Sequence, residues 1–371
     1  MKIVVTGTRG FPSIQGGVET HCEELYTRLA RFEGIDVTVV RRKGYLTAAS
    51  PASFKGVSFK DIDVPSFNGV ESALHTIYAT LYARRVRADI LHVHGVGPSV
   101  VVPLARILGL KVVMTHHGAD YERTKWGFFA RIIIRSGERF AALYAQRIIA
   151  ISPIITDLLK RKYGRVDNVS LIYNGVNLPS ADSVQSTAYL DALGVLPGRY
   201  VLAVGRFVKE KNFDRLIDCF TSMNTGMDLV IAGDADIETP YSRDLKAKAR
   251  NTPRVRLTGM IKGEKLSTLY AHAALFVLPS SHEGLPITVL EAMSYRRKTV
   301  VSDIDANLAL GLDASSYFRL GDKTDMAGKM LYQLGRAEGE EAYDLSAYNW
   351  DSIAAATLGV YDSLSDRIKR Q

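Results

Sequence analysis

The stretch ALFVLPSSHEGLPITVLEAM, residues 274–293, says most about how this chain folds. Its apolar run over 274–278 predicts a short buried strand. Gly284 and Pro286 interrupt that run, and Pro286 suits the first turn of a helix, where the missing N–H of proline costs nothing. The stretch therefore predicts a strand, a tight loop and a helix in succession.

The loop inside this stretch predicts an anion site. Its free amides and the positive end of the following helix suit an anion such as a diphosphate. Glu283 precedes the loop, and Glu291 follows it by about one and a half helical turns. The two carboxylates are therefore placed to bind hydroxyl groups on either side of a diphosphate, as a nucleotide sugar would require. The alternative is two solvated glutamates that flank an ordinary helix start.

These residues resemble the retaining glycosyltransferases of family 4, whose E-x7-E signature reads much like HEGLPITVLEAM. The resemblance implies that Glu283 contacts the transferred sugar and that Glu291 contacts the ribose of the donor. The loop between them, with Gly284, Leu285 and Pro286, belongs to the same predicted donor-binding site.

Apolar strand patterns alternate with helical patterns in both halves of the chain. The predicted strands cover 2–7, 36–40, 89–94, 111–116, 147–152, 169–176, 200–205, 227–233, 254–259, 275–280 and 299–303. Residues 177–198 are rich in small and turn residues, and we interpret them as a linker. Strands that alternate with helices predict a parallel, doubly wound sheet, here two in tandem. The fold class is α/β with two Rossmann-like domains.

Two such domains fit the GT-B architecture of the resembled family, in which the ligand lies in a cleft between them. Ligands bind doubly wound sheets at the carboxyl ends of the strands, and every motif described in this section follows a predicted strand. We expect an acceptor-side domain over 1–178 and a nucleotide-sugar-binding domain over 179–349. In that family a C-terminal helix crosses back to the first domain. The resemblance therefore implies that residues 350–371 form such a helix and belong to the first domain.

A glycine-rich loop, TGTRGFPSIQGGVE at 6–19, joins the first strand to the first helix. It lacks the G-x-G-x-x-G spacing of dinucleotide-binding proteins. Gly16 and Gly17 remove side chains where the helix begins, so a ligand can approach the backbone amides. A plain flexible loop is the alternative. Family 4 members carry a paired glycine here against the donor phosphates or the acceptor.

The segment VGRFVKEKN at 204–212 opens the second domain. Arg206 at the strand end and Lys211 five residues later can place two cationic side chains beside one diphosphate. Their charges would offset the negative charge on a leaving group. Surface lysines on a turn are the alternative, which fits Lys209 better. The family motif G-R-x-x-x-x-K-N matches and implies phosphate binding by Arg206 and Lys211.

Polar residues also follow the strand at 111–116, in THHGAD. A histidine at a strand end is often a packing or capping residue. In the family, the histidine before the glycine reaches the transferred sugar, which favours His117, and Asp120 is a candidate contact for the acceptor. His92 and His94 alternate with apolar residues, so we interpret them as packed and leave them out of the site.

The turn TGMIK at 258–262 comes one strand before the two glutamates. Similar turns in the family present backbone groups to the nucleotide base, which makes Met260 and Ile261 candidate donor contacts. A simple turn is the alternative.

The 371-residue chain has a formal net charge of +8, and that surplus is concentrated in one window. Between residues 123 and 165, the sequence contains ten Lys or Arg residues and only two acidic residues. Arg131, Arg135 and Arg139 recur every four residues beside aromatic side chains, as on one helix face. This stripe predicts either a helix resting on an anionic membrane or a solvated basic edge.

The bulk properties suit a globular chain of two domains without a membrane span. Cys22 and Cys219 are far apart and form no metal-like spacing, so we expect both to be reduced and buried in a cytoplasmic protein.

The leading hypothesis is a cytoplasmic glycosyltransferase, peripheral to the membrane, that uses a nucleoside-diphosphate sugar and no metal cofactor. Its acceptor would be a saccharide or a lipid-linked saccharide in surface-polysaccharide or lipopolysaccharide assembly. The alternatives are a nucleotide-sugar epimerase of the same fold and an inverting rhamnosyltransferase. Nucleic-acid binding would explain the basic window but gives no role to Glu283, Arg206 and Lys211 together.

Overall fold

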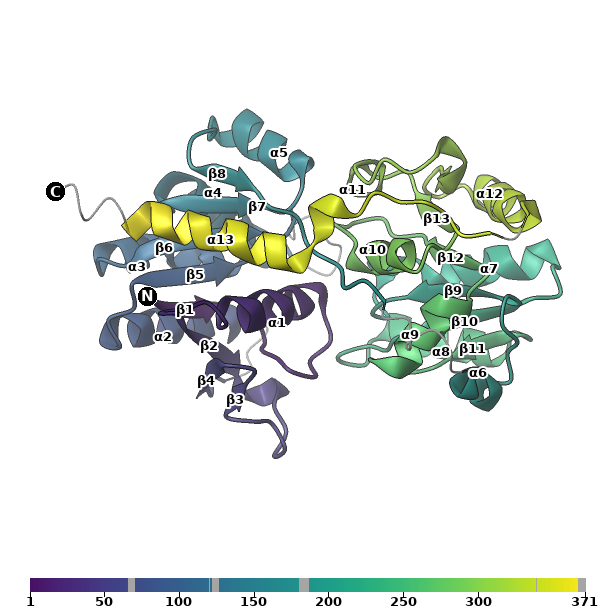
Figure 1. Ribbon diagram of the computed structural model, residues 1–371, viewed down its shortest axis with the longest axis horizontal. Coiled ribbons are helices and arrows are strands. Elements are labelled where there is room, and N and C mark those ends of the chain that lie inside the picture. The colour runs from purple at the N-terminus through teal and green to yellow at the C-terminus, as the bar shows by residue number, and fades with distance from the viewer. Residues whose placement is uncertain (66–70, 120, 122–126, 180–186, 338, 366–371) are drawn as a thin grey trace. The chain divides into compact units, whose positions relative to one another are not determined.

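The computed structural model describes residues 1–65, 71–119, 121, 127–179, 187–337 and 339–365. The chain divides into two compact units: unit 1 joins Met1–Gly175 to Tyr348–Gln371, and unit 2 is Val176–Ala347. Figure 1 traces the chain through both of them. Each unit has a mainly parallel sheet between helices, which confirms the prediction of two Rossmann-like α/β domains.

Unit 1 contains an eight-stranded sheet in the order β3-β4-β2-β1-β5-β6-β7-β8. Its strands are β1 (Lys2–Thr6), β2 (Asp36–Arg42), β3 (Ser53–Phe54), β4 (Val57–Ile62), β5 (Ile90–His94), β6 (Lys111–His116), β7 (Arg147–Ala150) and β8 (Val169–Leu171). Every pair is parallel except the β3–β4 hairpin at one edge. The strand order reverses beside β1, which pairs with both β2 and β5. Such a reversal opens a crevice for ligands at the carboxyl ends of the strands.

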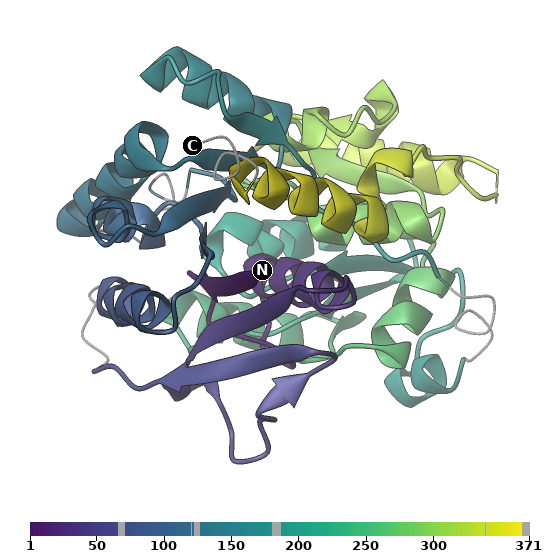
Figure 2. The same cartoon turned by 60° about the vertical axis from the view of Figure 1, so that its left-hand side comes forward.

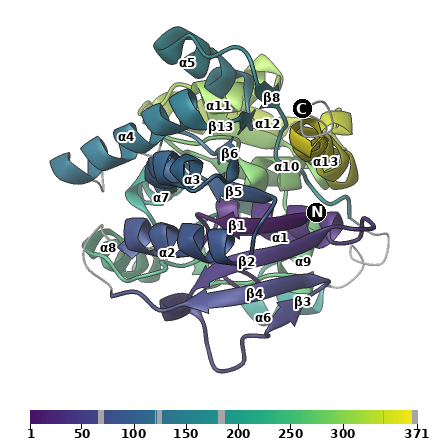
Figure 3. The ribbon, with the colours of Figure 1, turned by 90° about the vertical axis from the view of Figure 1, so that its left-hand side faces the viewer.

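Helices cover both faces of this sheet. They are α1 (Gly17–Leu29), α2 (Glu71–Arg85), α3 (Val102–Ile107), α4 (Phe128–Tyr144), α5 (Pro153–Tyr163) and α13 (Trp350–Ser365). In Figure 3, α1 and α13 lie on one face, and α2, α3 and α4 lie on the other. Figures 1 and 2 both show α13 beside α1, and their apolar side chains share one core with β1 and β2. The last helix therefore completes the core of unit 1.

Unit 2 contains a six-stranded parallel sheet in the order β11-β10-β9-β12-β13-β14. Its strands are β9 (Tyr200–Val204), β10 (Asp228–Ala232), β11 (Val255–Leu257), β12 (Leu275–Leu278), β13 (Thr299–Ser302) and β14 (Tyr317–Phe318). Its helices are α6 (Ala188–Leu193), α7 (Phe213–Met223), α8 (Pro240–Arg250), α9 (Glu264–His272), α10 (Ile287–Ser294), α11 (Asp305–Leu308) and α12 (Lys323–Gly335). The strand order reverses at β9, which pairs with β10 and β12.

The strands predicted from the sequence are all present, mostly with differences of one or two residues at their ends, but the strand predicted over 169–176 ends at Leu171. Two short elements, the β3–β4 hairpin and β14, were not predicted because they lie at sheet edges and carry no long apolar run. The stretch interpreted as a linker contains α6, which packs against α9, so that part of the interpretation was wrong. Both cysteines are free and buried, as expected.

Candidate active site

The loops after β9 and β12 of unit 2 bring together two of the residues predicted from separate motifs. Lys211 Nζ lies 2.6 Å from Glu283 Oε1, and both side chains are largely shielded from solvent. The loops are joined a second time where the Ser281 amide donates to the Glu210 carbonyl at 2.8 Å. The Asn212 side-chain amide also donates to the Pro279 carbonyl at 2.9 Å. Three contacts thus hold a cation and a carboxylate at the carboxyl edge of the sheet.

The second predicted cation is also paired with a carboxylate. Arg206 Nη1 lies 2.9 Å from Asp236 Oδ2, in the loop that follows β10. Sequence reasoning missed Asp236, because nothing in the segment around it marks it as a partner of a residue thirty positions earlier. Arg206 and Lys211 therefore come from one loop, and each is held by a carboxylate from a different neighbouring loop.

Glu291 lies on α10, one and a half turns after the loop that carries Glu283. The Tyr270 hydroxyl of α9 donates to Glu291 Oε2 at 2.7 Å. Burial and the neighbouring Glu291 charge raise the pKa of Tyr270 well above its usual value, so this hydroxyl stays protonated. The Tyr270 ring also stacks on Tyr295, with centroids 5.6 Å apart. These contacts fix the orientation of the Glu291 carboxylate.

The remaining predicted donor residues of unit 2 lie in two loops. Gly284, Leu285 and Pro286 lead into α10; Leu285 is buried, and Pro286 is the residue just before the first helical position. Met260 is half exposed after β11, and Ile261 follows it with partial exposure. Neither of these two residues is joined to Lys211 or Glu283 by a hydrogen bond within the described part of the chain.

In the glycine loop of unit 1, Gly16 packs against an ion pair, whereas Gly17 has open space around its Cα. Gly16 precedes the first turn of α1 with φ at 147°, and Gly17 is its first residue. A Cβ added to Gly16 would clash with Glu19 Oε2 and Arg9 Nη2, which are themselves 3.0 Å apart. Burial raises the pKa of Glu19, but the hydrogen bonds and charge of Arg9 outweigh this and lower it. Gly16 is therefore required by packing within the loop.

His117 lies among other imidazoles of unit 1. Its Nε2 is 2.9 Å from His94 Nδ1, and its ring contacts those of His94 and His21. His94 and His92 are buried, as expected, and His94 bonds to the predicted site residue His117. Burial lowers the pKa of His21 to about 4 and holds the pKa values of His94 and His117 well below their ordinary range. The three rings are therefore neutral at pH 7.

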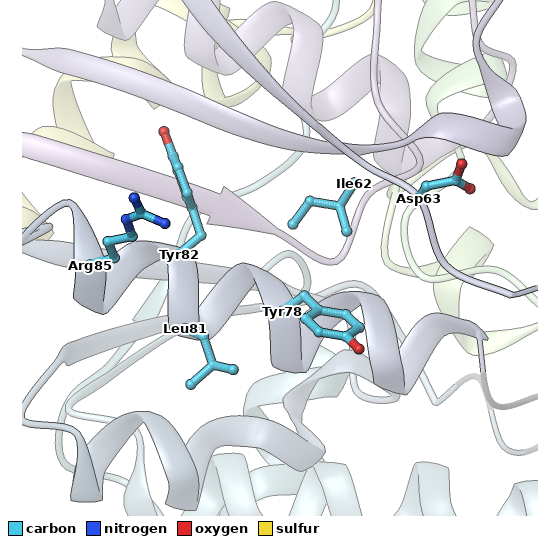
Figure 4. Close-up of a pocket in the computed structure, with 6 residues that line it drawn as sticks. All are labelled: Ile62, Asp63, Tyr78, Leu81, Tyr82 and Arg85. Atoms are coloured by element: carbon cyan, nitrogen blue, oxygen red, sulfur yellow. The ribbon is translucent and has the colours of Figure 1, made fainter.

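Asp120, the predicted acceptor contact, lies outside the described residues. A pocket of unit 1, between the end of β4 and α2, is shown in Figure 4. None of the predicted site residues lines it; its walls are Ile62, Asp63, Tyr78, Leu81, Tyr82 and Arg85.

The basic window contains a helix, α4, as its pattern predicted. Arg135, Arg139 and Lys162 line a groove on this surface with the apolar side chains of Ile132 and Leu143. Under it, the buried Glu138 accepts from Tyr163 at 2.9 Å and pairs with Lys162. Burial opposes ionisation of Glu138, but the hydrogen bonds from His116 and Lys162 lower its pKa to about 2.

Across the described part of the chain, no helix is both long and apolar enough to cross a bilayer.

Comparison with known proteins identifies a family for both units. Residues 15–179 match the model described as Glycosyltransferase Family 4, and residues 198–335 match the one described as Glycosyl transferases group 1. The chain is 27% identical over 306 residues to alpha-D-kanosaminyltransferase of Streptomyces kanamyceticus, in a match that covers 75% of this chain and 79% of that protein.

Solved structures agree on the fold. Sucrose-phosphate synthase from Thermosynechococcus elongatus superposes with a TM-score of 0.80 at 19% identity, over 98% of this chain and 99% of that one. HepE (Alr3699) of Anabaena in complex with UDP-glucose gives 0.73 at 15% identity, over 100% of both chains. The motifs around Glu283 and Arg206, the two Rossmann-like sheets and the matches to both units lead to one conclusion. The chain is a glycosyltransferase of the family 4 type.

Proposed function

We propose that this glycosyltransferase moves a sugar from a nucleoside-diphosphate sugar to a saccharide or a lipid-linked saccharide, with retention of configuration. The observation that carries the proposal is the 2.6 Å contact between Lys211 and Glu283. It joins the residue expected to bind phosphate to the residue expected to bind the transferred sugar. In a nucleotide sugar, those two groups are directly bonded.

The two ion pairs of unit 2 suit a diphosphate that arrives and leaves. Without a donor, Asp236 and Glu283 neutralise Arg206 and Lys211. Diphosphate oxygens accept the same charge-assisted hydrogen bonds as carboxylate oxygens, so the donor can replace the carboxylates around both cations. Once bound, the cations offset the negative charge that grows on the leaving diphosphate, where electrostatic stabilisation supplies much of catalysis.

We propose that Glu283, released from Lys211 by the donor, accepts hydrogen bonds from hydroxyl groups of the transferred sugar, and that His117 also contacts this sugar. Glu291, held by Tyr270, binds the ribose hydroxyls. Met260 and Ile261 present backbone groups to the base, and the Gly16–Gly17 turn lies against phosphate or acceptor. These roles follow the family resemblance and the positions of the residues at strand ends.

The proposed transfer needs no covalent nucleophile and no metal at the donor. The acceptor oxygen attacks the anomeric carbon on the face from which the phosphate leaves. The bond from that carbon to the phosphate oxygen breaks as the bond to the acceptor oxygen forms, and the departing phosphate takes the acceptor proton. The protein then contributes positioning and charge.

Thermal-shift screening against UDP-, GDP-, dTDP- and ADP-sugars tests the donor class. One nucleotide series should raise the melting temperature of the wild-type protein, and it should raise that of the Lys211→Ala variant less. Mass spectrometry with a saccharide acceptor should then show a product heavier by one sugar. Conversion of the donor into an isomer without any acceptor would instead identify an epimerase, and the proposal would fail.

We further propose that the surface of α4 rests on an anionic membrane, where a lipid-linked acceptor would be found. Exposed Ile132 and Leu143 line the groove together with its basic side chains, and Ile133 of the same helix is also exposed. Apolar and basic side chains on one helix suit the boundary between headgroups and acyl chains. This surface supports a role for the protein at the inner face of the membrane, in polysaccharide or lipopolysaccharide assembly.

Sedimentation with anionic vesicles tests the membrane proposal. Binding should fall as salt rises, because the attraction is screened beyond about 10 Å at 0.1 M. Substitution of Arg131, Arg135 and Arg139 by glutamate should abolish vesicle binding. Each basic residue near the membrane surface contributes roughly 1 kcal/mol to that binding. The same substitution at Arg84, Arg85 and Arg87, which changes the net charge equally, should not abolish it. Equal loss in both triple variants would leave net charge, and not α4, as the cause.

A further inference from the structure

Three histidines of unit 1 bring one ring nitrogen each into a small cluster. His21 comes from α1, His94 from the end of β5, and His117 from the residue just after β6. The three ring nitrogens lie within 4.8 Å of one another, and His94 Nδ1 is 2.9 Å from His117 Nε2. The three residues come from separate elements that are far apart in the sequence, so the fold alone assembles them.

The other nitrogens of the cluster are held from outside. His21 Nδ1 donates to Asn174 Oδ1 at 2.9 Å, which leaves the lone pair of His21 on Nε2. His94 Nε2 lies 2.5 Å from the Tyr26 hydroxyl, which in turn is 2.8 Å from His92 Nδ1. When the His94 Nε2–H donates to Tyr26 and Tyr26 donates to His92, the lone pair of His94 lies on Nδ1. A second partner that fixes the ring and its tautomer is the usual support of a metal-binding histidine.

One nitrogen of the cluster lacks a protein partner. His21 Nε2 is buried and has no hydrogen bond among the residues that the structure describes. A buried acceptor without a partner costs free energy, which a ligand on that nitrogen would recover.

The donor set specifies the class of ligand. Three imidazole nitrogens suit zinc, copper, nickel and cobalt, whereas magnesium and calcium prefer oxygen. Bonds of about 2.0–2.1 Å place the donors of a tetrahedral zinc site roughly 3.3 Å apart, so the cluster must contract by at most about 1.5 Å. His117 can supply that movement, because it is only partly buried and precedes Gly118, whose φ is 123°.

We propose that His21, His94 and His117 form a binding site for one divalent transition-metal ion, with Asn174 and Tyr26 as the groups that orient two of the ligands. Three histidines leave a fourth position open to water or another small ligand. The site shares His117 with the sugar contact proposed above, but metal binding by the three histidines can be measured without donor and does not depend on that proposal.

Titration of tag-free, chelator-treated protein with Co²⁺ tests the site, because tetrahedral or five-coordinate nitrogen ligation produces visible absorption. One equivalent should bind with saturation, and Zn²⁺ should displace it. X-ray absorption of the zinc form should show nitrogen neighbours at about 2.0–2.1 Å. Asn174→Ala should weaken binding by about 10–100-fold, the range typical of such supporting partners.

His117→Asn is the decisive variant, since its ring is the least buried of the three and its loss threatens the fold least. It should weaken Co²⁺ binding at least as much as Asn174→Ala, and His21→Asn should do the same. His282→Asn, a partly exposed histidine of unit 2, is the matched control and should bind like the wild type. The proposal is overturned by the absence of saturable one-equivalent binding in the wild type. Binding that survives in folded His117→Asn protein overturns it equally.

Discussion

The two candidate regions of this enzyme handle polar groups in opposite ways. At the edge of the unit 2 sheet, Arg206 and Lys211 are charged, partly exposed and paired with carboxylates. At the edge of the unit 1 sheet, His94 and His117 are neutral and enclosed by other rings. A charged pair can exchange one oxyanion for another without leaving a buried charge unpaired. Neutral imidazoles enclosed by other rings, by contrast, resist protonation.

Acid should therefore destabilise unit 1 well before unit 2. The pKa values of His21 and His92 are lowered by burial to about 4 and about 3, whereas unfolded histidine titrates near 6.5. Because the unfolded chain binds more protons, this stability is complete above about pH 6.5 and is lost as the pH falls toward 4. For His21 alone, the loss is on the order of 3 kcal/mol.

Tryptophan fluorescence measures this effect in unit 1, because Trp350 is buried in the core of that unit and the sequence of unit 2 contains no tryptophan. The fluorescence-monitored midpoint of urea unfolding should fall between pH 7 and pH 5, and less so in His21→Asn. Glu138, with a pKa of about 2, should still be ionised throughout this range. A midpoint that does not change with pH would show that the histidines are not protected from protonation.

Glu283→Ala should produce the largest effect on catalysis. Removal of a group that contacts the transferred sugar should lower kcat by about 10²–10³-fold, as with other preorganised contacts to a transition state. Because Glu283 pairs with Lys211, its loss also frees that cation. Calorimetry should therefore show that the variant binds free nucleoside diphosphate as well as the wild type or better. Weaker nucleotide binding with normal kcat would mean that the donor lies in the reverse direction.

Lys211→Ala should weaken binding of both the donor and the free nucleoside diphosphate. A charge-assisted hydrogen bond is worth roughly 1.5–3 kcal/mol, which corresponds to about 10–100-fold in Kd. Arg206→Ala should act similarly, whereas Lys209→Ala, in the same loop, is the control and should not. Unchanged affinity in folded Lys211→Ala protein would remove Lys211 from the phosphate site.

Tyr270→Phe should have the smallest effect of this series. It removes the hydrogen bond that orients Glu291 but keeps the ring that stacks on Tyr295. One neutral hydrogen bond contributes about 0.5–1.5 kcal/mol, so nucleotide affinity should fall by roughly 2–12-fold. The same substitution should leave affinity unchanged when the nucleotide lacks ribose hydroxyls. An equal loss for both nucleotides would show that Tyr270 does not act through the ribose.

The fold was predictable because long apolar runs alternate with amphipathic helices, and the elements that were missed are short ones, such as β3, β14 and α6. The sequence also pointed to Arg206, Lys211, Glu283 and Glu291 as candidates, since each lies in a segment that follows a strand. The partners of these candidate residues could not be predicted from the sequence. Asp236 and Tyr270 are joined to them only in the folded chain, and His21 meets Asn174 across 153 positions. Pairing over such separations leaves no periodicity in the sequence.

The position of α13 sets an order of events during synthesis. Unit 1 needs this helix, because Trp350 and Tyr361 are buried in its core and the Tyr361 hydroxyl lies 2.6 Å from His92 Nδ1. All of unit 2 is made before α13, and its core is drawn from one continuous stretch. Unit 2 can therefore fold from its own continuous stretch, whereas residues 1–175 cannot complete their core until α13 is available. Until then, the apolar side chains of α1 that pack against α13 lack their partner.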